Sequence, residues 1–366
     1  MLAENAYLHG KPESTGLLRS QMSDFKVFEK LPFSPCGEGE HLFIHVRKTG
    51  ANTLFVAREL AKYFQVKEQL VSYAGLKDRF AVAEQWFGVH VPGKQTYDLS
   101  DLVIEGVEVL HYERHNKKLR TGALDGNRFE LILREVTDLK AFSERWKAIT
   151  EQGVPNYFGE QRFGIDGGNI DRALALFSGT KVKDKKKRGM YLSAARSTIF
   201  NQVISQRIQI EKFNELLMGD VLMLAGTQSV FLLDALDDKT QQRFIEKDLD
   251  ITAPMWGAGE LMTTGEAQLL EQGIADQNNE FSQGLPRFGL KQERRRIRLI
   301  ISETDMEAIP TSDGSIEVKV SFFLPAGCYA TTVLRELLVY KDMTTRVHTA
   351  NTESALQSNA DNVSES

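Results

Sequence analysis

Apolar and polar side chains alternate with a period of two in several segments near both ends of the chain, a pattern typical of strands with one buried face. Four segments show this alternation: residues 42–46, 81–91, 127–133 and 316–322. A shorter apolar segment, residues 71–73, predicts another strand that ends at Gly75. We therefore expect strands on both sides of the middle of the chain.

Helical spacing of apolar residues marks three further segments. One begins after Asn52 and carries apolar residues from Val56 to Phe64 near one face. Spacings of three and four from Leu192 to Val203 predict a second helix that runs towards Phe213, and residues 331–340 predict a third. Polar and Gly-rich sequence between residues 219 and 289 predicts connections rather than regular elements.

This order of elements predicts an α+β fold, with a mixed or antiparallel sheet that a C-terminal strand completes and a helix-rich, basic α+β domain inserted between its parts. The predicted sheet domain is discontinuous and comprises residues 1–152 and 303–346. The predicted inserted domain comprises residues 153–302. We expect residues 347–366 to be a disordered tail, because they are rich in Ser and Asn and poor in large apolar residues.

The composition is that of an ordinary globular protein, with 42% hydrophobic and 26% charged residues, and 366 residues suffice for about two domains. Segments long and apolar enough to span a bilayer are absent from the sequence, and residues 1–10 lack the features of a secretory signal. We therefore expect a cytoplasmic protein. Two cysteines, Cys36 and Cys328, are too few for a disulfide framework or a thiolate zinc site.

The net charge of −5 alone argues against a polyanionic partner, but the charge is uneven along the chain. Residues 351–366 account for three of the five net negative charges. Basic residues gather in three clusters: residues 181–196, residues 287–298 and a looser one at residues 114–120. A single cluster is typical of a solvated loop, whereas three in an otherwise acidic chain favour a surface that binds a phosphate backbone.

Motifs for nucleotide phosphates, dinucleotides and catalytic zinc are absent from the sequence. Two histidine pairs have a spacing of four, His41 with His45 and His111 with His115. The second pair lies in a Lys- and Arg-rich stretch without a clear third ligand, so we interpret all four as packed or solvated imidazoles rather than metal ligands. We expect no metal and no nucleotide cofactor.

The best chemical signal is Asp78, which follows a short strand and lies between Lys77 and Arg79. Adjacent positive charge favours the ionised carboxylate, which suits nucleophilic or electrostatic work. A local ion pair in a β-turn is the alternative, because Asp is a favoured turn residue. These residues alone leave both interpretations open.

Motifs along nearly the whole chain extend this signal. In chain order they are residues 8–12 (LHGKP), 16–19 (GLLR), 24–29 (DFKVFE), 37–41 (GEGEH), 73–79 (YAGLKDR), 84–86 (EQW), 126–129 (GNRF), 133–136 (LREV), 153–159 (GVPNYFG), 161–164 (QRFG), 192–196 (LSAAR), 200–201 (FN), 324–327 (LPAG) and 335–337 (REL). With these motifs in this order, the sequence resembles the TruD family of tRNA pseudouridine synthases.

The resemblance implies a role for each matched site residue. It places the family's catalytic nucleophile at Asp78, and substrate-binding residues at Phe25 and Asn127. Tyr329 stands where family members commonly have Phe; its ring can still stack on a uracil, and whether its hydroxyl takes part in proton transfer is open. Arg19 matches a basic residue that pairs with the catalytic aspartate or a phosphate.

The implied reaction breaks the N1–C1′ bond of a uridine, turns the uracil and rejoins it through C5. Such an isomerisation needs an ionised carboxylate, flat side chains against the base and a polar amide to orient it. The target implied by the family is uridine 13 of tRNA, with no cofactor. Lys185, Lys186, Lys187 and Arg188 are the expected contacts to the RNA backbone, and we expect a monomer.

Two other functions remain open. The chain could be a tRNA-binding or folding factor whose isomerase activity is dispensable, in which case turnover discriminates between the two. A hydrolase with a catalytic carboxylate pair would need a second carboxylate near Asp78, which a sequence cannot show.

Overall fold

The computed structural model describes residues 4–93 and 95–344, which fall into two compact units. The first, called the sheet unit, comprises Glu13–Trp146, Ile301–Gly327 and the described residues from Leu337 onwards. The second, called the helical unit, comprises Lys147–Ile300, Cys328–Glu336 and the described residues up to Pro12. The predicted tail, residues 347–366, lies outside the described residues. The predicted domains, residues 1–152 with 303–346 and residues 153–302, remain a prediction.

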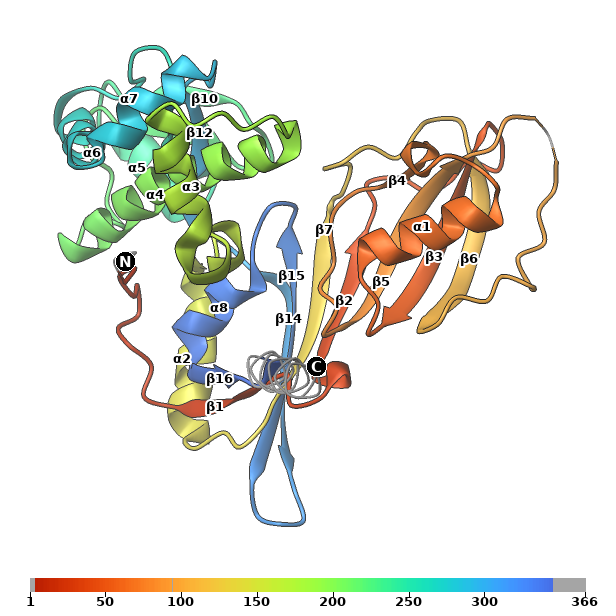
Figure 1. The fold of residues 1–366 in the computed structure, drawn as a ribbon. Helices are drawn as coiled ribbons and strands as arrows, with labels where there is room; N and C mark the ends of the chain where they lie inside the picture. The colour runs from red at the N-terminus through yellow and green to blue at the C-terminus, as the bar shows by residue number, and fades with distance from the viewer. Residues whose placement is uncertain (1–3, 94, 345–366) are drawn as a thin grey trace, which may run out of the picture. The chain divides into compact units, whose positions relative to one another are not determined.

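An eight-stranded mixed sheet forms the frame of the sheet unit (Figure 1). Its order is β14-β15-β7-β2-β5-β3-β6, with β4 paired to β5. Neighbouring strands are antiparallel, except that β2 runs parallel to β5. The strands are β2 (Phe25–Lys30), β3 (His41–Thr49), β4 (Val71–Tyr73), β5 (Val82–His90), β6 (Val107–His115), β7 (Gly126–Leu133), β14 (Ser302–Pro310) and β15 (Ile316–Pro325).

Helix α1 (Thr53–Tyr63) covers one face of this sheet, where Val56 and Leu60 share a buried cluster with Ile44 and Phe87. The helix begins where the sequence predicts, because the Asn52 side chain accepts a hydrogen bond from the Phe55 N–H. The unit also contains η1 (Met22–Asp24), η2 (Glu68–Leu70) and a separate parallel pair of β1 (Thr15–Leu18) with β16 (Val339–Asp342). Helix α2 (Leu139–Gln152) crosses the boundary between the units.

The alternating segments are all strands, as predicted: residues 42–46 in β3, 71–73 in β4, 81–91 around β5, 127–133 in β7 and 316–322 in β15. One prediction at the C-terminal end is wrong. The helix expected over residues 331–340 is α8 (Ala330–Leu337), and the chain then enters β16. Residues 339 and 340 lie in a strand that pairs in parallel with Thr15 and Gly16. Local periodicity does not predict a pairing between segments so far apart in sequence.

The helical unit packs its helices around α4 (Lys185–Gln209), whose residues Ile199, Phe200 and Val203 are buried (Figure 1). A four-stranded sheet of order β10-β9-β11-β12 lies in the same unit, so both units combine helices and strands and the α+β class is confirmed. Its elements are β8 (Val154–Pro155), η3 (Glu160–Arg162), η4 (Ile165–Gly167), α3 (Gly168–Phe177), α4, β9 (Val221–Leu224), β10 (Val230–Leu232), α5 (Asp238–Ile245), β11 (Leu249–Met255), α6 (Gly265–Gln277), α7 (Asn279–Arg287), β12 (Glu293–Arg296), β13 (Arg298–Leu299) and α8.

The expectation of connections between residues 219 and 289 is therefore wrong. Strands β9 and β11 and helices α6 and α7 occupy much of that segment. Gly273 and Gly284 lie inside these two helices, and Gly284 packs so closely that an added Cβ would come within 2.4 Å of the Phe177 ring. The glycines that suggested loops include one that permits close helix packing.

Candidate active site

The segment that carries Asp78 connects β4 to β5, and side chains from α1 and β5 hold its backbone. Gln85 Nε2 donates to the Gly75 carbonyl at 2.6 Å, and Thr53 Oγ1 accepts from the Lys77 N–H at 2.9 Å. Thr53 also donates to Gln85 Oε1, and both side chains are buried. The loop is thus fixed by a connected polar network rather than by a local turn alone.

The Asp78 carboxylate forms an ion pair with Arg19, at 2.8 Å between Oδ2 and Nη1. Its Oδ1 accepts from the Phe80 N–H at 3.1 Å. The side chain of Asp78 keeps 26% of its surface exposed, whereas that of Arg19 keeps 7%. The carboxylate is therefore held in place by the buried Arg19 and by a backbone N–H, while it stays accessible to a ligand.

The sequence neighbours of Asp78 are not the cations that face it. Arg79 donates to the Gly50 carbonyl, and Lys77 turns towards other side chains. Arg19 pairs with the carboxylate instead, although it is 59 residues away in the chain. The cation that pairs with Asp78 is therefore Arg19, the basic residue that the resemblance also indicates, and not the flanking Lys77 or Arg79.

Arg19 follows β1 in a left-handed backbone conformation, with φ of 57°, which is uncommon for a residue other than glycine. Its guanidinium lies 4.4 Å from the centre of the Phe25 ring and 3.7 Å from Asp342 Oδ2. Phe25 is 5% exposed and also contacts Phe129 edge-on. Phe25 therefore presents little ring surface to a ligand, and its main contact here is with the Arg19 guanidinium.

Asn127 on β7 joins the same neighbourhood through Lys77. Lys77 Nζ donates to Asn127 Oδ1 at 2.7 Å and lies 2.8 Å from Glu29 Oε2. Glu29 Oε1 accepts from the Trp86 N–H at 3.1 Å. Within the sheet unit, the structure thus connects Asp78, Arg19, Phe25 and Asn127 through direct contacts and through the adjacent Lys77.

A buried lysine lies behind this loop. Lys48 Nζ on β3 donates to the carbonyls of Asp78 and Ala51, each at 2.7 Å. Burial lowers the pKa of Lys48 to about 8; the charge of Asp78 opposes this shift and that of Lys77 adds to it. Lys48 therefore fixes the backbone of Asp78 and places positive charge beneath it.

Sequence reasoning missed four residues of this neighbourhood: Lys48, Lys77, Glu29 and Asp342. Lys77 and Glu29 were visible as members of motifs, but pattern alone gave no reason to pair them. Lys48 lies just beyond the predicted strand at residues 42–46, at the parity of its apolar face, so continued alternation was the signal that could have placed it among buried residues. Asp342 lies in the segment that was predicted to follow a helix.

Tyr329 belongs to the helical unit and is described only within it. Its hydroxyl accepts hydrogen bonds from Arg162, at 2.6 Å from Nη2 and 3.1 Å from Nε. An added Cβ at Gly159 would come within 3.3 Å of the Tyr329 ring. The Tyr329 hydroxyl is thus anchored by Arg162.

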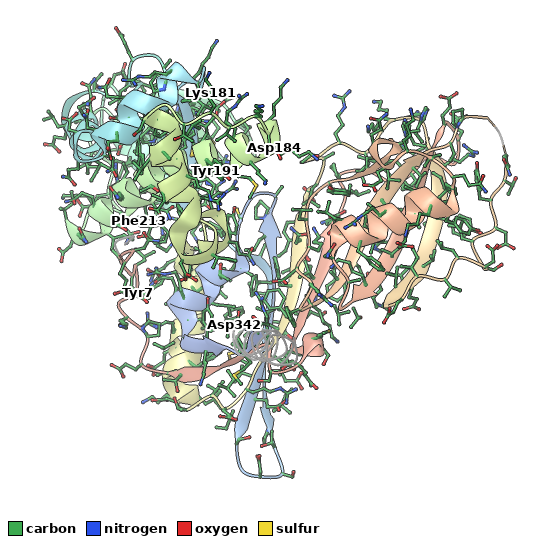
Figure 2. All side chains as sticks on the ribbon, viewed as in Figure 1. Tyr7, Lys181, Asp184, Tyr191, Phe213 and Asp342 are labelled. Atoms are coloured by element: carbon green, nitrogen blue, oxygen red, sulfur yellow. The ribbon has the colours of Figure 1, made fainter. Side chains whose placement is uncertain are left out.

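Lys185, Lys186, Lys187 and Arg188 form the first turn of α4, where Asp184 caps the helix (Figure 2). Asp184 accepts from the N–H groups of Lys186 and Lys187, and these bonds lower its pKa. Cations in the first turn are unfavourable next to the positive end of the helix dipole. An anionic partner would relieve that repulsion.

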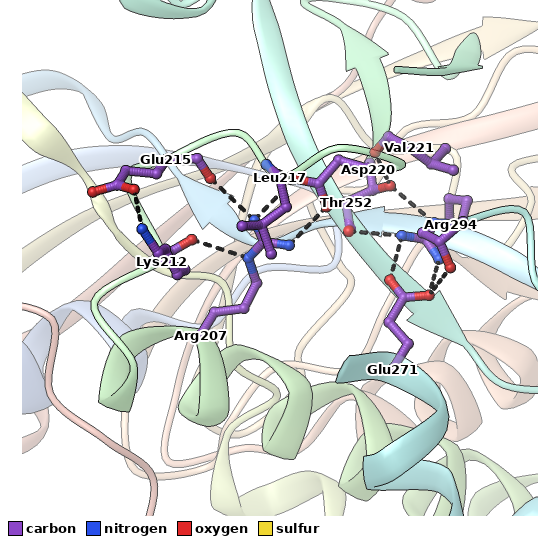
Figure 3. A network of polar contacts seen from close by, with 10 residues as sticks. Arg207, Lys212, Glu215, Leu217, Asp220, Val221, Thr252, Glu271 and Arg294 are labelled. Carbon is purple, nitrogen blue, oxygen red and sulfur yellow. Dashed lines mark hydrogen bonds and ion pairs between the residues drawn. The ribbon is translucent and has the colours of Figure 1, made fainter. Parts of the chain in front are cut away.

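The second basic cluster is largely internal. Arg294 forms a buried pair with Glu271 at 2.7 Å and donates to Thr252 (Figure 3). Arg295 lies 4.4 Å from the centre of the Phe158 ring, and Arg296 pairs with Asp250 at 2.7 Å. These guanidinium groups stabilise the helical unit, so the interpretation of this cluster as an RNA-binding surface does not hold for them.

The third cluster is mixed. Arg114 donates to the carbonyls of Gly39, Val91 and Gln95, whereas Lys117, Lys118 and Arg120 are exposed.

The histidines show no metal site: over residues 4–93 and 95–344, no group of three His, Cys, Asp or Glu residues is arranged to hold an ion. His45 instead stacks on Trp86, with 4.6 Å between the ring centres. No helix in the described part of the chain is long and apolar enough to cross a membrane.

Comparison with known proteins confirms the resemblance that the motifs indicate. A family model described as tRNA pseudouridine synthase D (TruD) matches residues 1–172 and 177–337. The chain is 74% identical over 364 residues to tRNA pseudouridine synthase D of Colwellia psychrerythraea, which covers 98% of this chain and 99% of that protein. The protein of the same name from Aeromonas hydrophila is 46% identical over 338 residues, 92% of this chain and 95% of the relative.

The fold also has a solved counterpart. A crystal structure from Methanosarcina mazei, described as that of a candidate tRNA pseudouridine synthase D (TruD), matches with a TM-score of 0.68 and 21% sequence identity. The match covers 91% of this chain and 96% of that one. At this level of identity the likeness concerns the fold.

Proposed function

Because the chain belongs to the tRNA pseudouridine synthase D (TruD) family, we propose that it isomerises uridine to pseudouridine in tRNA, with Asp78 as the nucleophile and uridine 13 as the target. The observation that carries this proposal is the accessible Asp78 carboxylate, held by the buried guanidinium of Arg19. A carboxylate fixed beside a guanidinium is oriented, as attack on a sugar carbon requires.

The chemistry moves one bond and leaves the composition of the nucleotide unchanged. The N1–C1′ bond breaks with its electron pair passing to the uracil, and Asp78 either bonds to C1′ or stabilises the positive charge that develops there. The uracil then turns, C5 bonds to C1′, the proton on C5 leaves and N1 gains one. Both routes place the carboxylate next to C1′, so both depend on Asp78.

The remaining site residues bind the base in this proposal. Asn127 offers its amide to a carbonyl oxygen of the uracil. Phe25 contacts the base and also packs against the Arg19 guanidinium. Tyr329 contributes a flat ring, and its hydroxyl is oriented by Arg162. Stacking on aromatic rings offsets part of the few kcal/mol needed to extract a base from its helix.

We propose that Lys185, Lys186, Lys187 and Arg188 bind the tRNA backbone. The three lysines are exposed and Arg188 is half-buried, and the unfavourable position of these cations at the start of α4 supports an anionic partner. We propose that the protein acts as a monomer in the cytoplasm on tRNA, with no cofactor and no metal.

Asp342 gives one reason to test a hydrolase, because a second carboxylate approaches Arg19 at 3.7 Å. A hydrolase would release free uracil and leave an abasic ribose, whereas an isomerase retains the base. Asp342 Oδ1 already accepts two hydrogen bonds from Thr344, which favours a structural role. We expect Asp342→Asn to retain pseudouridine formation, with no uracil released by either protein.

Mapping of pseudouridine in total tRNA from cells with and without this protein tests the proposal. We expect pseudouridine at position 13 to disappear without the protein, to return with the wild-type chain and to stay absent with Asp78→Asn. An unchanged map would contradict the isomerase assignment. Restoration by Asp78→Asn would instead favour a tRNA-binding or folding factor with dispensable catalysis.

A further inference from the structure

Lys77 bridges two side chains that come from different strands. Its Nζ lies 2.8 Å from Glu29 Oε2 on β2 and 2.7 Å from Asn127 Oδ1 on β7. The side chains of Lys77 and Glu29 are 7% and 0% exposed. The ammonium is therefore buried between a full negative charge and an amide oxygen.

This contact determines which way the Asn127 amide points. A lysine ammonium has only donors, so the amide must present its oxygen to Lys77 and direct its NH₂ group elsewhere. Across residues 4–93 and 95–344, no protein atom accepts a hydrogen bond from Asn127 Nδ2. Asn127 is half-buried, so this donor is available to a ligand.

Glu29 makes the arrangement durable. Its carboxylate is buried, pairs with Lys77 and accepts from the Trp86 N–H. Loss of either member of a buried ion pair leaves an uncompensated charge, so the two residues hold each other in place. The backbone of Lys77 is fixed as well, through its N–H bond to Thr53.

Resting on the proposed function, we propose that Lys77 and Glu29 are positioning residues that hold Asn127 as a hydrogen-bond donor to a carbonyl oxygen of the target uracil. When the N1–C1′ bond breaks, negative charge spreads onto the uracil oxygens. A donor already aimed at one of them stabilises the transition state more than the bound substrate. A flipped amide would turn its own oxygen towards that charge.

A double-mutant cycle under single turnover tests this inference, with an unmodified tRNA transcript as substrate. We expect Asn127→Ala to lower the rate constant about 100-fold, comparable to the loss of one preorganised donor. Lys77→Met should lower it at least about 10-fold with little change in tRNA affinity. Since Lys77 acts through Asn127, the double variant should be no more than about 3-fold slower than Asn127→Ala.

Lys77→Met leaves Glu29 unpaired and could reduce folding, so Lys77→Met with Glu29→Gln provides a neutral pair for comparison. It should melt close to the wild-type temperature and still show the slow rate. Lys62→Met, at an exposed lysine on α1, is the matched control and should react at the wild-type rate.

The outcomes separate the two levels of the account. If the wild-type chain forms no pseudouridine, the proposed function fails. If the wild type is active and Asp78→Asn is inactive, but the neutral pair reacts at the wild-type rate, the inference about Lys77 and Glu29 fails alone. Multiplicative effects of Lys77→Met and Asn127→Ala would also overturn it, because independent effects exclude action through Asn127.

Discussion

Arg19 and Asp78 form an ion pair of 2.8 Å although 59 residues separate them in the sequence. Arg19 is placed by the turn after β1, and Asp78 by the loop between β4 and β5. The local sequence pattern of neither segment predicts this contact. The pair brings a buried cation to an accessible carboxylate, and the account of the site depends on it.

Replacement of Arg19 by Gln should lower kcat/KM by about 10- to 100-fold, because Asp78 loses the charge-assisted hydrogen bond that orients it. The protein should stay folded, since Gln can still lie against Phe25 and donate to Asp78. Kinetics on an unmodified transcript provide the measurement, and Arg58→Gln, at an exposed arginine on α1, is the control. Full activity in Arg19→Gln would show that the pair is structural only.

Lys48 should give stability a specific pH dependence. Its pKa is lowered to about 8 in the folded chain, whereas an unfolded lysine titrates near 10.4, so the unfolded state binds more protons between these values. The contribution of Lys48 to the free energy of unfolding therefore rises with pH across this window, by at most about 1.4 kcal/mol per pH unit.

Denaturant titrations of the wild type and of Lys48→Met, at intervals from pH 7 to pH 10, isolate this effect. The difference between the two free energies should shift in favour of the wild type as the pH rises, because other titrating groups cancel. A difference that is constant with pH would mean that Lys48 has an ordinary pKa.

Simultaneous change of Lys185, Lys186 and Lys187 to Ala should weaken tRNA binding and flatten its dependence on salt. Each phosphate contact contributes about 0.7 to 0.9 to the magnitude of the slope of log K against log salt, so loss of three contacts should lower that magnitude by up to about 2 to 3. A triple change of exposed Lys62, Lys140 and Lys147 removes the same charge elsewhere and is the control. Equal salt slopes for the two triple variants would mean that the α4 lysines are solvated and do not contact the RNA.

Arg294 should behave in the opposite way. Its guanidinium is enclosed by Glu271 and Thr252, so Arg294→Gln should destabilise the folded protein by about 3 kcal/mol or more. The salt slope of tRNA binding should stay that of the wild type under conditions where the variant is folded. Thermal melting and binding titrations measure the two effects, and a reduced slope with unchanged stability would contradict the structural assignment.

The sequence predicts those parts of the fold that local pattern determines. Strand β15 and helix α1 follow directly from periodicity and from the Asn52 cap. Strand β16 was mistaken for helix because its apolar residues continue those of α8, and its pairing with β1 spans most of the chain. Helices α6 and α7 were missed because they contain glycines, at least one of which serves close packing.

The same division holds for the site. Asp78 is identifiable from its motif, but its immediate neighbours suggest Lys77 and Arg79 as its cations, and both turn elsewhere in space. Only the resemblance to a known family points to Arg19, which forms the ion pair. The charge of residues 287–298 suggested a surface, yet Arg294 lies inside the unit. Contacts between segments distant in sequence determine which charged side chains are exposed and which are buried in ion pairs. Composition does not predict these contacts.

Single-turnover reaction of Asp78→Asn with unmodified tRNA decides whether the Asp78 carboxylate performs the isomerisation. We expect this variant to bind tRNA with an affinity close to that of the wild type and to form no pseudouridine. Pseudouridine formed by Asp78→Asn at the wild-type rate would contradict this expectation.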